Sequence, residues 1–389
     1  MEVRLHNGMS SIDPVAWNDL AAANPTPLLT WEWLYHLESS GSIVPENGWH
    51  PVHMTFHENG AMVAAVPLYL RTDSWGEFVF DFAFAEVAEQ LGKTYYPKLV
   101  GMSPASPVPA FRFLTASGRE DDLVPQIMDS IRSFCRTRDI PVLQFNFVLP
   151  EWTRRLERLG MQPWKHHGFE WHNDGYATFD DYLQRFRKNQ RRNIRRERRS
   201  LQSQGIRTRV IHGPEAPPII YRRMSEYYLR TNSLFGPYAA QFLDTRFFTD
   251  MPRAVQEHVW FVAAYEDDSD NPDDPLALAL LVRRNDRIYG RYWGTREDRK
   301  DLHFNVCYYA PIEWAIREKI SLFDPGMGSP HKVRRGFRSV SDWSLHYFFD
   351  PHMQAILEAN MDRINTLEDR QITVMDGAVP FKNLPPVDR

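Results

Sequence analysis

The sequence has few cysteines, no long apolar run and no recognisable leader segment. Its two cysteines, Cys135 and Cys307, are too few for a disulfide framework and lack the CxxC spacing of a metal site. Apolar stretches such as residues 61–70 are far too short to span a bilayer. The opening residues MEVRLHNG lack the apolar segment of a signal peptide. We therefore expect a soluble, cytoplasmic protein that holds no metal ion.

Several common catalytic signatures are also missing. The sequence contains no Walker loop, no GxSxG and no HExxH, so nothing in it supports phosphotransfer, serine hydrolysis or zinc proteolysis. The acidic segment 267–275 lacks the glycine and the distal glutamate of an EF-hand, and we interpret it as a solvated surface insertion. A net charge of −4 gives no overall attraction to nucleic acid or membranes.

What is present is a long chain rich in apolar and aromatic residues. A length of 389 residues predicts two or three domains, and 43% apolar residues are ample for folding. Aromatic residues make up 13%, a density at which they often line clefts as well as cores.

One order of elements, strands followed by a helix and a buried strand, is predicted twice. In the first half it comprises strands 50–57 and 61–71 around Asn59-Gly60, helix 124–138 and strand 141–148. In the second half it comprises strands 259–265, 276–283 and 286–293, helix 304–319 and a strand from Ser321. The pattern indicates two α/β units of similar architecture.

A basic helix is predicted between the halves, over residues 179–204. It carries nine Lys or Arg between Arg185 and Arg199 and one apolar stripe. The cationic face could follow phosphates of tRNA, of a lipid pyrophosphate headgroup or of an acidic membrane. Alternatively, the helix is a solvated connector whose arginines pair with acids elsewhere, because Glu197 is the only acid in the run. The candidate polyanion-binding residues are Lys188, Arg191, Arg192 and Arg195.

Residues 303–346 are the most informative segment. They predict a helix with one apolar stripe, a short buried strand and a glycine-rich loop with four basic residues. This order is typical of sites that bind anionic ligands. The basic residues of the loop are His331, Lys332, Arg334 and Arg335.

Short blocks in both halves carry a resemblance. In the first half they are GWHP (48–51), VPLYLR (66–71), GEFVFDFAFAE (76–86) and YYPKL (95–99). In the second half they are RRERR, YGRYWG (289–294), LHFNVCYY (302–309), HKVRRGF (331–337) and WSLH (343–346). Together they resemble a bacterial family of predicted N-acyltransferases labelled for peptidoglycan biosynthesis or recognition. That family is similar to the Fem-type aminoacyl transferases and is built on the acetyltransferase (GNAT) fold.

The resemblance implies an α/β fold with mixed sheets and two GNAT-like domains in tandem. The domains expected are an N-terminal GNAT-like domain (1–175), a basic connecting helix (176–205) and a C-terminal GNAT-like domain (206–350), followed by a helix and irregular tail (351–389). An active site between the domains is expected, with most of the chemistry on the second.

Some positions depart from the family pattern. Asn305 stands where the family usually has Glu, and Ala310 where it has Gln. The loop that normally reads glycine-alanine-glutamine-glycine-glutamate is here residues 326–330, GMGSP. Two carboxylates suited to acid–base work are therefore absent. Either the chemistry does not need them, or this chain is a divergent or catalytically weakened member.

The resemblance also implies candidate site residues. In the GNAT fold, backbone amides at a splayed strand and a helix N-terminus hold the oxyanion and the pyrophosphate, which points here to Gly294, Thr295 and Arg296. The catalytic candidates are His331, His303 and Tyr292. The substrate-binding candidates are Trp293, Tyr308, Lys332, Arg334, Arg335, Asp81 and Lys98. For Asp81 and Lys98 a structural salt bridge is an alternative role.

The function predicted is N-acyl transfer of an acyl or aminoacyl group to an amine, on a cell-wall precursor or another anionic small molecule. The co-substrate would be an acyl-CoA or an aminoacyl-tRNA, without a tightly bound cofactor, and the substrate could be lipid-linked, with peripheral contact to a membrane. The competing hypothesis is a non-catalytic protein that binds a peptidoglycan precursor or RNA with the same cationic surfaces.

Overall fold

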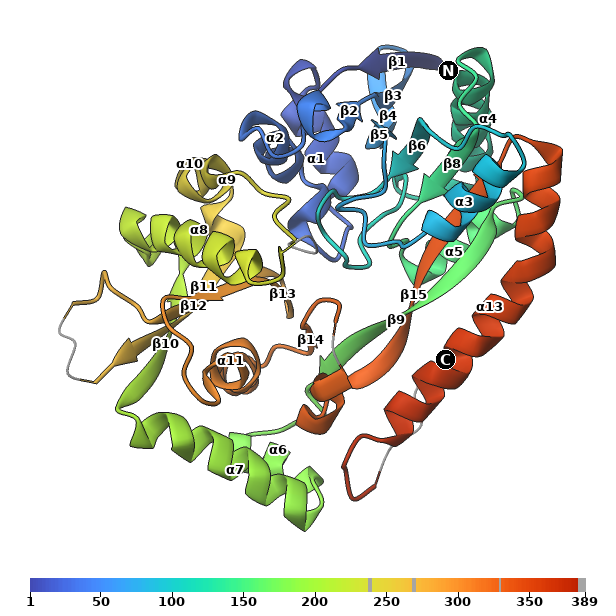
Figure 1. Cartoon of the computed structure of the whole chain (residues 1–389). Coiled ribbons are helices and arrows are strands. Elements are labelled where there is room, and N and C mark those ends of the chain that lie inside the picture. Colours follow the sequence, from blue (N-terminus) through green and yellow to red (C-terminus); the bar gives the residue numbers. More distant parts are fainter. Residues whose placement is uncertain (237–239, 268–270, 329, 384–389) are drawn as a thin grey trace. The chain divides into compact units, whose positions relative to one another are not determined.

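The computed structural model describes residues 1–236, 240–267, 271–328 and 330–383. The chain divides into two units: unit 1 comprises Met1–His166 and Ser341–Asp369, and unit 2 comprises His167–Val340 and Arg370–Arg389. The chain passes from one unit to the other within β9 (Gln162–His172), within β15 (Arg338–Phe348) and within α13 (Pro351–Gly377) (Figure 1).

Unit 1 contains two groups of strands. One is an antiparallel sheet in the order β1-β3-β4-β7, and the other has the order β15-β8-β6-β5-β2 with a parallel pair of β6 and β8. The strands are β1 (Glu2–His6), β2 (Trp49–Pro51), β3 (His53–Glu58), β4 (Ala61–Val66), β5 (Leu68–Arg71), β6 (Lys98–Gly101), β7 (Leu114–Thr115) and β8 (Val142–Phe145). The helices are α1 (Pro14–Ala21), α2 (Trp31–Ser39), α3 (Phe82–Gln90), α4 (Glu120–Thr137) and α5 (Pro150–Glu157).

The predicted hairpin of unit 1 is present, but its second strand is divided. Asn59 and Gly60 both have positive φ, as a tight two-residue hairpin turn requires, and β3 pairs with β4 around them. The predicted strand 61–71 is wrong as one element: it separates at Pro67 into β4 and β5, which lie in different sheets. A proline has no N–H to donate and therefore interrupts a ladder.

Unit 2 is one mixed sheet covered by helices. Its order is β10-β11-β12-β13-β14-β9, with antiparallel neighbours except the parallel pair of β13 and β14. The strands are β9, β10 (Ile206–His212), β11 (Val259–Glu266), β12 (Ala277–Arg284), β13 (Arg287–Thr295), β14 (Leu322–Asp324) and the start of β15. The helices are α6 (Phe179–Arg185), α7 (Lys188–Ser203), α8 (Pro218–Ser233), α9 (Thr245–Thr249), α10 (Met251–Ala254), α11 (Leu302–Phe304), a π-helical turn (Asn305–Tyr309) and α12 (Ala310–Arg317).

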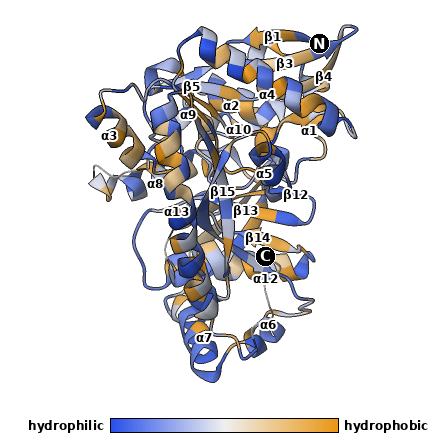
Figure 2. Ribbon diagram, turned by 90° about the vertical axis from the view of Figure 1, so that its right-hand side faces the viewer, coloured by the Kyte–Doolittle hydropathy of each residue, from blue (hydrophilic) through white to orange (hydrophobic). Residues whose placement is uncertain are grey.

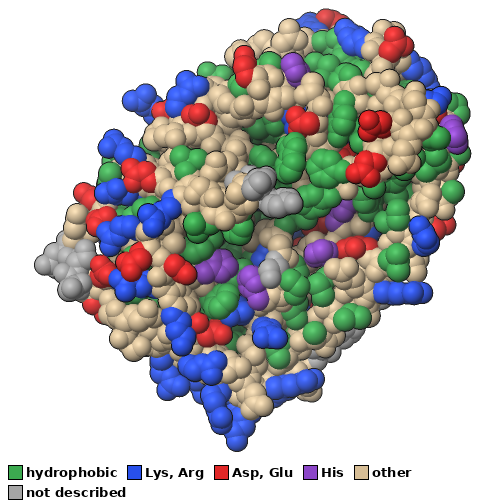
Figure 3. All heavy atoms as spheres, in the orientation of Figure 1, with side chains coloured by type: hydrophobic (Ala, Val, Ile, Leu, Met, Phe, Trp, Pro, Cys, Tyr) green, Lys and Arg blue, Asp and Glu red, His purple; other side chains and the backbone are tan. Residues whose placement is uncertain are grey.

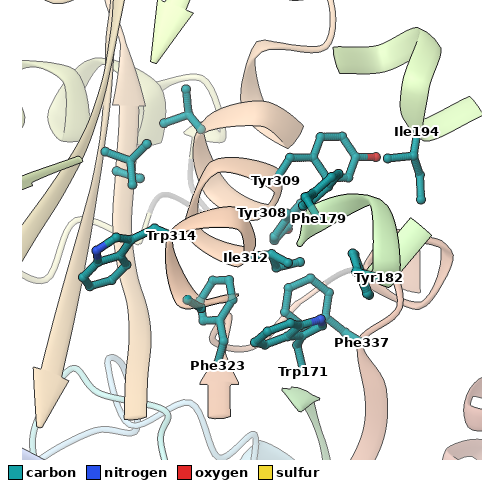
Figure 4. Packing of buried hydrophobic residues seen from close by; sticks show 14 of the residues in the cluster. Trp171, Phe179, Tyr182, Ile194, Tyr308, Tyr309, Ile312, Trp314, Phe323 and Phe337 are labelled. Carbon is teal, nitrogen blue, oxygen red and sulfur yellow. The ribbon is translucent and has the colours of Figure 1, made fainter. Parts of the chain in front are cut away.

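An aromatic core holds the elements of unit 2 together. Figure 4 shows Tyr308, Tyr309 and Ile312 on one side of this core, with Phe179 and Tyr182 of α6 and Ile194 of α7 facing them. These side chains are buried. The apolar stripe predicted for the basic segment is therefore the face by which α6 and α7 are anchored, while most of α7 is hydrophilic (Figure 2).

The basic segment is two helices, so the prediction of one helix over 179–204 is wrong. Phe186 has extended backbone angles (φ −76°, ψ 148°) and forms an isolated bridge with Phe381. The N–H of Arg187 donates to the carbonyl of Pro380 at 2.8 Å. The chain thus leaves the helical conformation at Phe186 to pair with a segment that is distant in sequence, which the local pattern could not reveal.

No helix in the described ranges is both long enough and apolar enough to cross a membrane.

The packing of α8 against β13 depends on Gly294. A Cβ atom at this position would lie 2.2 Å from the backbone C and O atoms of Tyr227, far inside van der Waals contact. A Cβ atom added to Gly290, on the same strand, would lie 3.4 Å from its nearest neighbours, backbone atoms of Pro325, which is an ordinary van der Waals distance. Helix α8 therefore approaches β13 so closely at Gly294 that only glycine fits there, whereas Gly290 has room for a Cβ atom.

We predict that Gly294→Ala lowers the free energy of unfolding by about 1–3 kcal/mol or more, because backbone of α8 must move. Gly290→Ala is the matched control and should change it by about 1 kcal/mol or less. Chemical denaturation of both variants measures the difference. Equal stability of the two variants would contradict the close packing described for Gly294.

Candidate active site

The candidate site lies where two parallel strands stop pairing. Residues 287–289 of β13 pair with residues 322–324 of β14, and the pairing ends at Tyr289 and Asp324. On its other edge, β13 has a bulge opposite Leu280 and Leu281 of β12. A bulge bends a strand and redirects its side chains. Beyond these points lies a cavity of about 260 Å³.

Six of the predicted site residues line this cavity, and they come from three separate segments. β13 contributes Tyr292 and Trp293, the helical segment 302–309 contributes His303 and Tyr308, and the loop after β14 contributes His331 and Lys332. Within the described part of the chain, the lining residues are Ala279, Leu280, Leu281, Gly290, Arg291, Tyr292, Trp293, His303, Cys307, Tyr308, Pro325, Met327, His331 and Lys332.

The helix beside the cavity contains an irregular turn. Residues 302–304 are α-helical, residues 305–309 form the π-helical turn, and α12 begins at Ala310. Pro311 follows directly, and proline cannot donate a hydrogen bond to the preceding turn of an α-helix. Turns of this kind widen a helix locally and often occur at functional sites. Here the turn carries Cys307 and Tyr308, which line the cavity.

Two histidines of the cavity have lowered pKa values. The Nε2 atom of His331 lies 3.1 Å from the hydroxyl of Tyr308, and the ring of His303 packs 4.6 Å from that of Trp293. Burial, together with the positive charges of Arg335 and Lys332, lowers the pKa of His331 to about 4. Burial and the charge of His331, then of Arg335 and Lys332, lower the pKa of His303 to about 3.

Lys332 is buried beside the cavity and fixes the loop after β14. Its Nζ donates to the carbonyl of Gly326 at 2.5 Å and to that of Met327 at 2.8 Å. Burial lowers its pKa, although the charge of Asp324 acts in the opposite direction. Burial likewise raises the pKa of Asp324, whose Oδ1 accepts the N–H of Gly326 at 2.7 Å. Asp324 is not among the predicted site residues, although its place at the end of a predicted buried strand was a signal for it.

The side chains of the two arginines of the loop have different environments. Arg335 is buried: its guanidinium stacks 3.3 Å above the ring of Phe304, donates to the carbonyl of His331 at 2.9 Å and forms an ion pair with Glu197 of α7 at 3.0 Å. Arg334 is exposed, and its carbonyl accepts a hydrogen bond from Gln190 at 2.8 Å. Neither residue lines the cavity.

The predicted cofactor-binding residues lie at the end of β13, outside the cavity lining. Gly294 packs against α8. The N–H of Thr295 donates to Oγ1 of Thr231 at 3.2 Å, and the N–H of Arg296 donates to the carbonyl of Leu276 at 2.8 Å. The guanidinium of Arg296 forms ion pairs with Asp274 and Glu266. The structure therefore uses these groups for hydrogen bonds and packing within unit 2.

Asp81 and Lys98 lie in unit 1, within a buried ionic network. Lys98 Nζ lies 2.5 Å from Asp81 and 2.8 Å from Glu77, and Arg71 lies 3.2 Å from Glu77. All of these side chains are fully buried. Burial acts to raise the pKa of Asp81, but the charge and hydrogen bond of Lys98, together with the side chains of Ser74 and Gln144, outweigh it and the pKa falls to about 2. The salt bridge considered as the alternative role is thus present.

The candidate polyanion-binding residues share the outer surface of α7. Lys188 and Arg192 are exposed, Arg191 donates to Gln184 at 3.0 Å, and Arg195 lies 3.2 Å from Asp180. Figure 3 shows Lys and Arg side chains gathered over this helix. Some of the cationic charge is therefore paired with acids from outside the helix, and some faces solvent.

Comparison with known proteins identifies the family. The profile of the FemAB-like family, described as peptidoglycan biosynthesis/recognition, matches residues 8–383. The chain belongs to this family. No curated protein matches the sequence.

Solved structures show a similar fold. FemX is 13% identical with a TM-score of 0.55, and the alignment covers 92% of this chain and 100% of FemX. The C-terminal domain of a putative lysylphosphatidylglycerol synthetase from Agrobacterium fabrum is 10% identical with a TM-score of 0.52, covering 90% and 96%. L-PGS from Bacillus licheniformis is 10% identical with a TM-score of 0.50, covering 91% and 97%. The predicted fold class, α/β with tandem GNAT-like domains, is confirmed. Family and fold together support the prediction of a transferase.

The structure explains one departure of this FemAB-like chain from the family pattern. The side-chain amide of Asn305 donates to the carbonyl of Glu197 at 3.1 Å and to that of Asp301 at 2.9 Å. A carboxylate has no proton to donate and would face two carbonyl oxygens. Asn305 therefore joins α7 to the cavity helix at a place where glutamate would be repelled.

We predict that the imidazoles of His303 and His331 remain neutral at pH 6, because burial and neighbouring cations lower both pKa values. His172 is the internal control, since its hydrogen bond with Glu170 raises its pKa. Ring-nitrogen chemical shifts measured between pH 8 and pH 5 distinguish the three residues. A titration midpoint above pH 6 for His303 or His331 would contradict the described environment.

Proposed function

We propose that the chain is an N-acyltransferase whose active site is the cavity beside β13 and β14. The observation that carries the proposal is the contact of the His331 imidazole with the hydroxyl of Tyr308, at 3.1 Å, in a cavity that Lys332 also lines. An amine attacks a carbonyl only in its deprotonated form, so a nearby base must accept its proton. An unprotonated imidazole with a fixed orientation fits this role.

The reaction requires one bond to form and one to break. The amine nitrogen attacks the carbonyl carbon of the donor, the C–N bond forms, and the C–O or C–S bond to the leaving group breaks. His331 takes the proton from the amine and returns it to the leaving oxygen or sulfur. Lys332 and the Tyr308 hydroxyl are donors that can stabilise negative charge on the carbonyl oxygen. This division of roles does not need the two carboxylates that the chain lacks.

The low pKa of His331 makes it a weak base when the cavity contains no anion. A polyanionic donor nearby would offset the charges of Arg335 and Lys332 and raise that pKa. Proton transfer would then become easier when the donor is bound. The same electrostatic argument favours donors with several phosphates.

The cationic surface of α7 supports aminoacyl-tRNA as the donor. Lys188 and Arg192 are exposed one helical turn apart, at a spacing that suits contact with a phosphate backbone. Acyl-CoA, which also carries phosphates, is the second candidate donor. For the acceptor, the family description supports an amine on a peptidoglycan precursor. A non-catalytic binding protein is the competing function, favoured by Asn305 and Pro330 in place of the family carboxylates.

We predict that His331→Gln lowers turnover by about 100-fold or more, because general base catalysis contributes roughly 10²–10⁴-fold. Tyr308→Phe should lower turnover less, since it removes only the hydroxyl that positions the imidazole. Transfer of a radiolabelled acyl group from aminoacyl-tRNA or acyl-CoA to an amine acceptor provides the measurement.

His172→Gln is the control for this experiment, because His172 lies on β9 outside the cavity lining and its loss should leave turnover unchanged. Full activity of His331→Gln would show that the imidazole takes no part in catalysis. Binding of donor and acceptor without turnover in the unmodified protein would favour the non-catalytic alternative.

We predict that the double charge reversal Lys188→Glu and Arg192→Glu weakens tRNA binding and reduces the slope of log affinity against log salt by about 2, roughly one for each lost phosphate contact. Arg154→Glu with Arg158→Glu is the matched control, because these residues are exposed at the same four-residue spacing at α5. Filter binding over a range of salt concentrations provides the measurement. If the two double variants had equal effects, α7 would not be a tRNA-binding surface and would only connect neighbouring elements.

A further inference from the structure

Much of the cavity wall is apolar. β12 forms one side of it, and the loop after β14 forms part of another. The apolar residues are Ala279, Leu280, Leu281, Trp293, Cys307, Pro325 and Met327. Burial raises the pKa of the Cys307 thiol, which is therefore neutral and acts as a small apolar group. A wall of this composition stabilises an apolar group that leaves water.

The charged groups at the cavity are of one sign. Among the residues that the structure describes, Arg291 and Lys332 are the charged residues of the lining, and none of the lining residues is Asp or Glu. The two imidazoles are neutral because burial and the neighbouring cations lower their pKa values. The nearby carboxyl of Asp324 is buried, does not line the cavity and is bonded to backbone at Gly326.

An ammonium group at the end of a side chain that enters this cavity would lose its hydration without gaining a counter-charge from the described lining residues. Desolvation of an unpaired charge is costly, and Arg291 and Lys332 would add repulsion. A carbonyl oxygen would instead meet donors, the hydroxyl of Tyr308 and the ammonium of Lys332. The cavity therefore favours an apolar group that is attached to a carbonyl and disfavours a group that ends in a cation.

The size of the cavity fits part of a substrate rather than the whole. Its volume of about 260 Å³ is slightly below the roughly 300–1,000 Å³ of pockets that enclose a whole drug-sized ligand. A tRNA, a coenzyme or a cell-wall precursor is far larger. The portion that enters the cavity is therefore the group next to the reacting carbonyl.

We propose that this cavity selects the side chain of the transferred group, accepting uncharged apolar side chains and rejecting those that carry an ammonium. The proposal rests on the proposed function, because it specifies the substrate class of the same site. Met327 is the residue best placed to test it. It lines the cavity from a loop whose conformation is set by Gly326 and Gly328, both with positive φ, and its contact to Lys332 is made by its backbone carbonyl.

The test measures binding of two small probes to the full chain by calorimetry. N-acetyl-norleucinamide and N-acetyl-lysinamide have side chains with the same four-carbon stem, and only the second ends in an ammonium. We expect the norleucine probe to bind more tightly by on the order of ten-fold. Met327→Glu places a carboxylate in the wall and should reduce this ratio by on the order of ten-fold, because the ammonium then has a counter-charge. Met327→Gln has the same shape without charge and should keep the original preference.

The outcomes are separable. Equal or tighter binding of the lysine probe, binding of neither probe, or an unchanged ratio in Met327→Glu would each overturn the selectivity. These measurements need no turnover, so they stand apart from the test of catalysis. A chain that prefers the norleucine probe but transfers no acyl group would keep the selectivity and refute the proposed function. A chain that transfers lysyl groups as fast as leucyl groups would keep the function and refute the selectivity.

Discussion

The buried guanidinium of Arg335 joins the parts of unit 2 that surround the cavity. It pairs with Glu197 of α7, stacks on Phe304 of the cavity helix and binds the carbonyl of His331 in the loop after β14. A buried charge is tolerated only where other groups satisfy it, and Arg335 finds each of these groups on a different element. The position of His331, and with it the contact to Tyr308, depends on this residue. Its charge also contributes to the low pKa of both cavity histidines.

This arrangement changes the interpretation of the basic loop. The sequence predicts that its lysine and two arginines bind an anion together. In the structure Arg335 is an internal support, Lys332 fastens the loop through two backbone carbonyls, and Arg334 alone is exposed. Basic residues adjacent in sequence thus have three different roles, because a short 3₁₀ helix at residues 330–335 directs successive side chains in different directions.

The sequence allowed the fold class and the segments of the cavity to be predicted. It did not allow the prediction of features that depend on contacts between residues distant in the chain. The order of strands and helices in unit 2 follows from local periodicity, and the blocks 289–294, 302–309 and 331–337 carried the family resemblance. The break at Phe186 arises from pairing with Phe381, and the role of Asn305 arises from carbonyl groups of α7 and of the preceding turn. Phe381 and Glu197 lie far along the chain from these two residues, so a local sequence pattern does not include them. Asp324 differs from these cases, because the predicted buried strand ends at it, although its raised pKa depends on burial that the strand pattern alone does not show.

The proposed function assigns two kinds of recognition to different parts of unit 2. The outer surface of α7 is cationic, as the proposed contact with a phosphate-rich donor requires, whereas the cavity is mainly apolar and its environment lowers the pKa of its histidines. Long-range attraction acts on the body of the donor and depends on salt, but it does not distinguish one transferred group from another. Discrimination between transferred groups requires a desolvated environment, where one ammonium without a partner is costly. Glu197 connects the two regions physically, because it lies on α7 and accepts hydrogen bonds from Arg335 and from Tyr309 of the cavity helix. In the proposed mechanism, recognition and the base therefore do not depend on the positions of the family carboxylates.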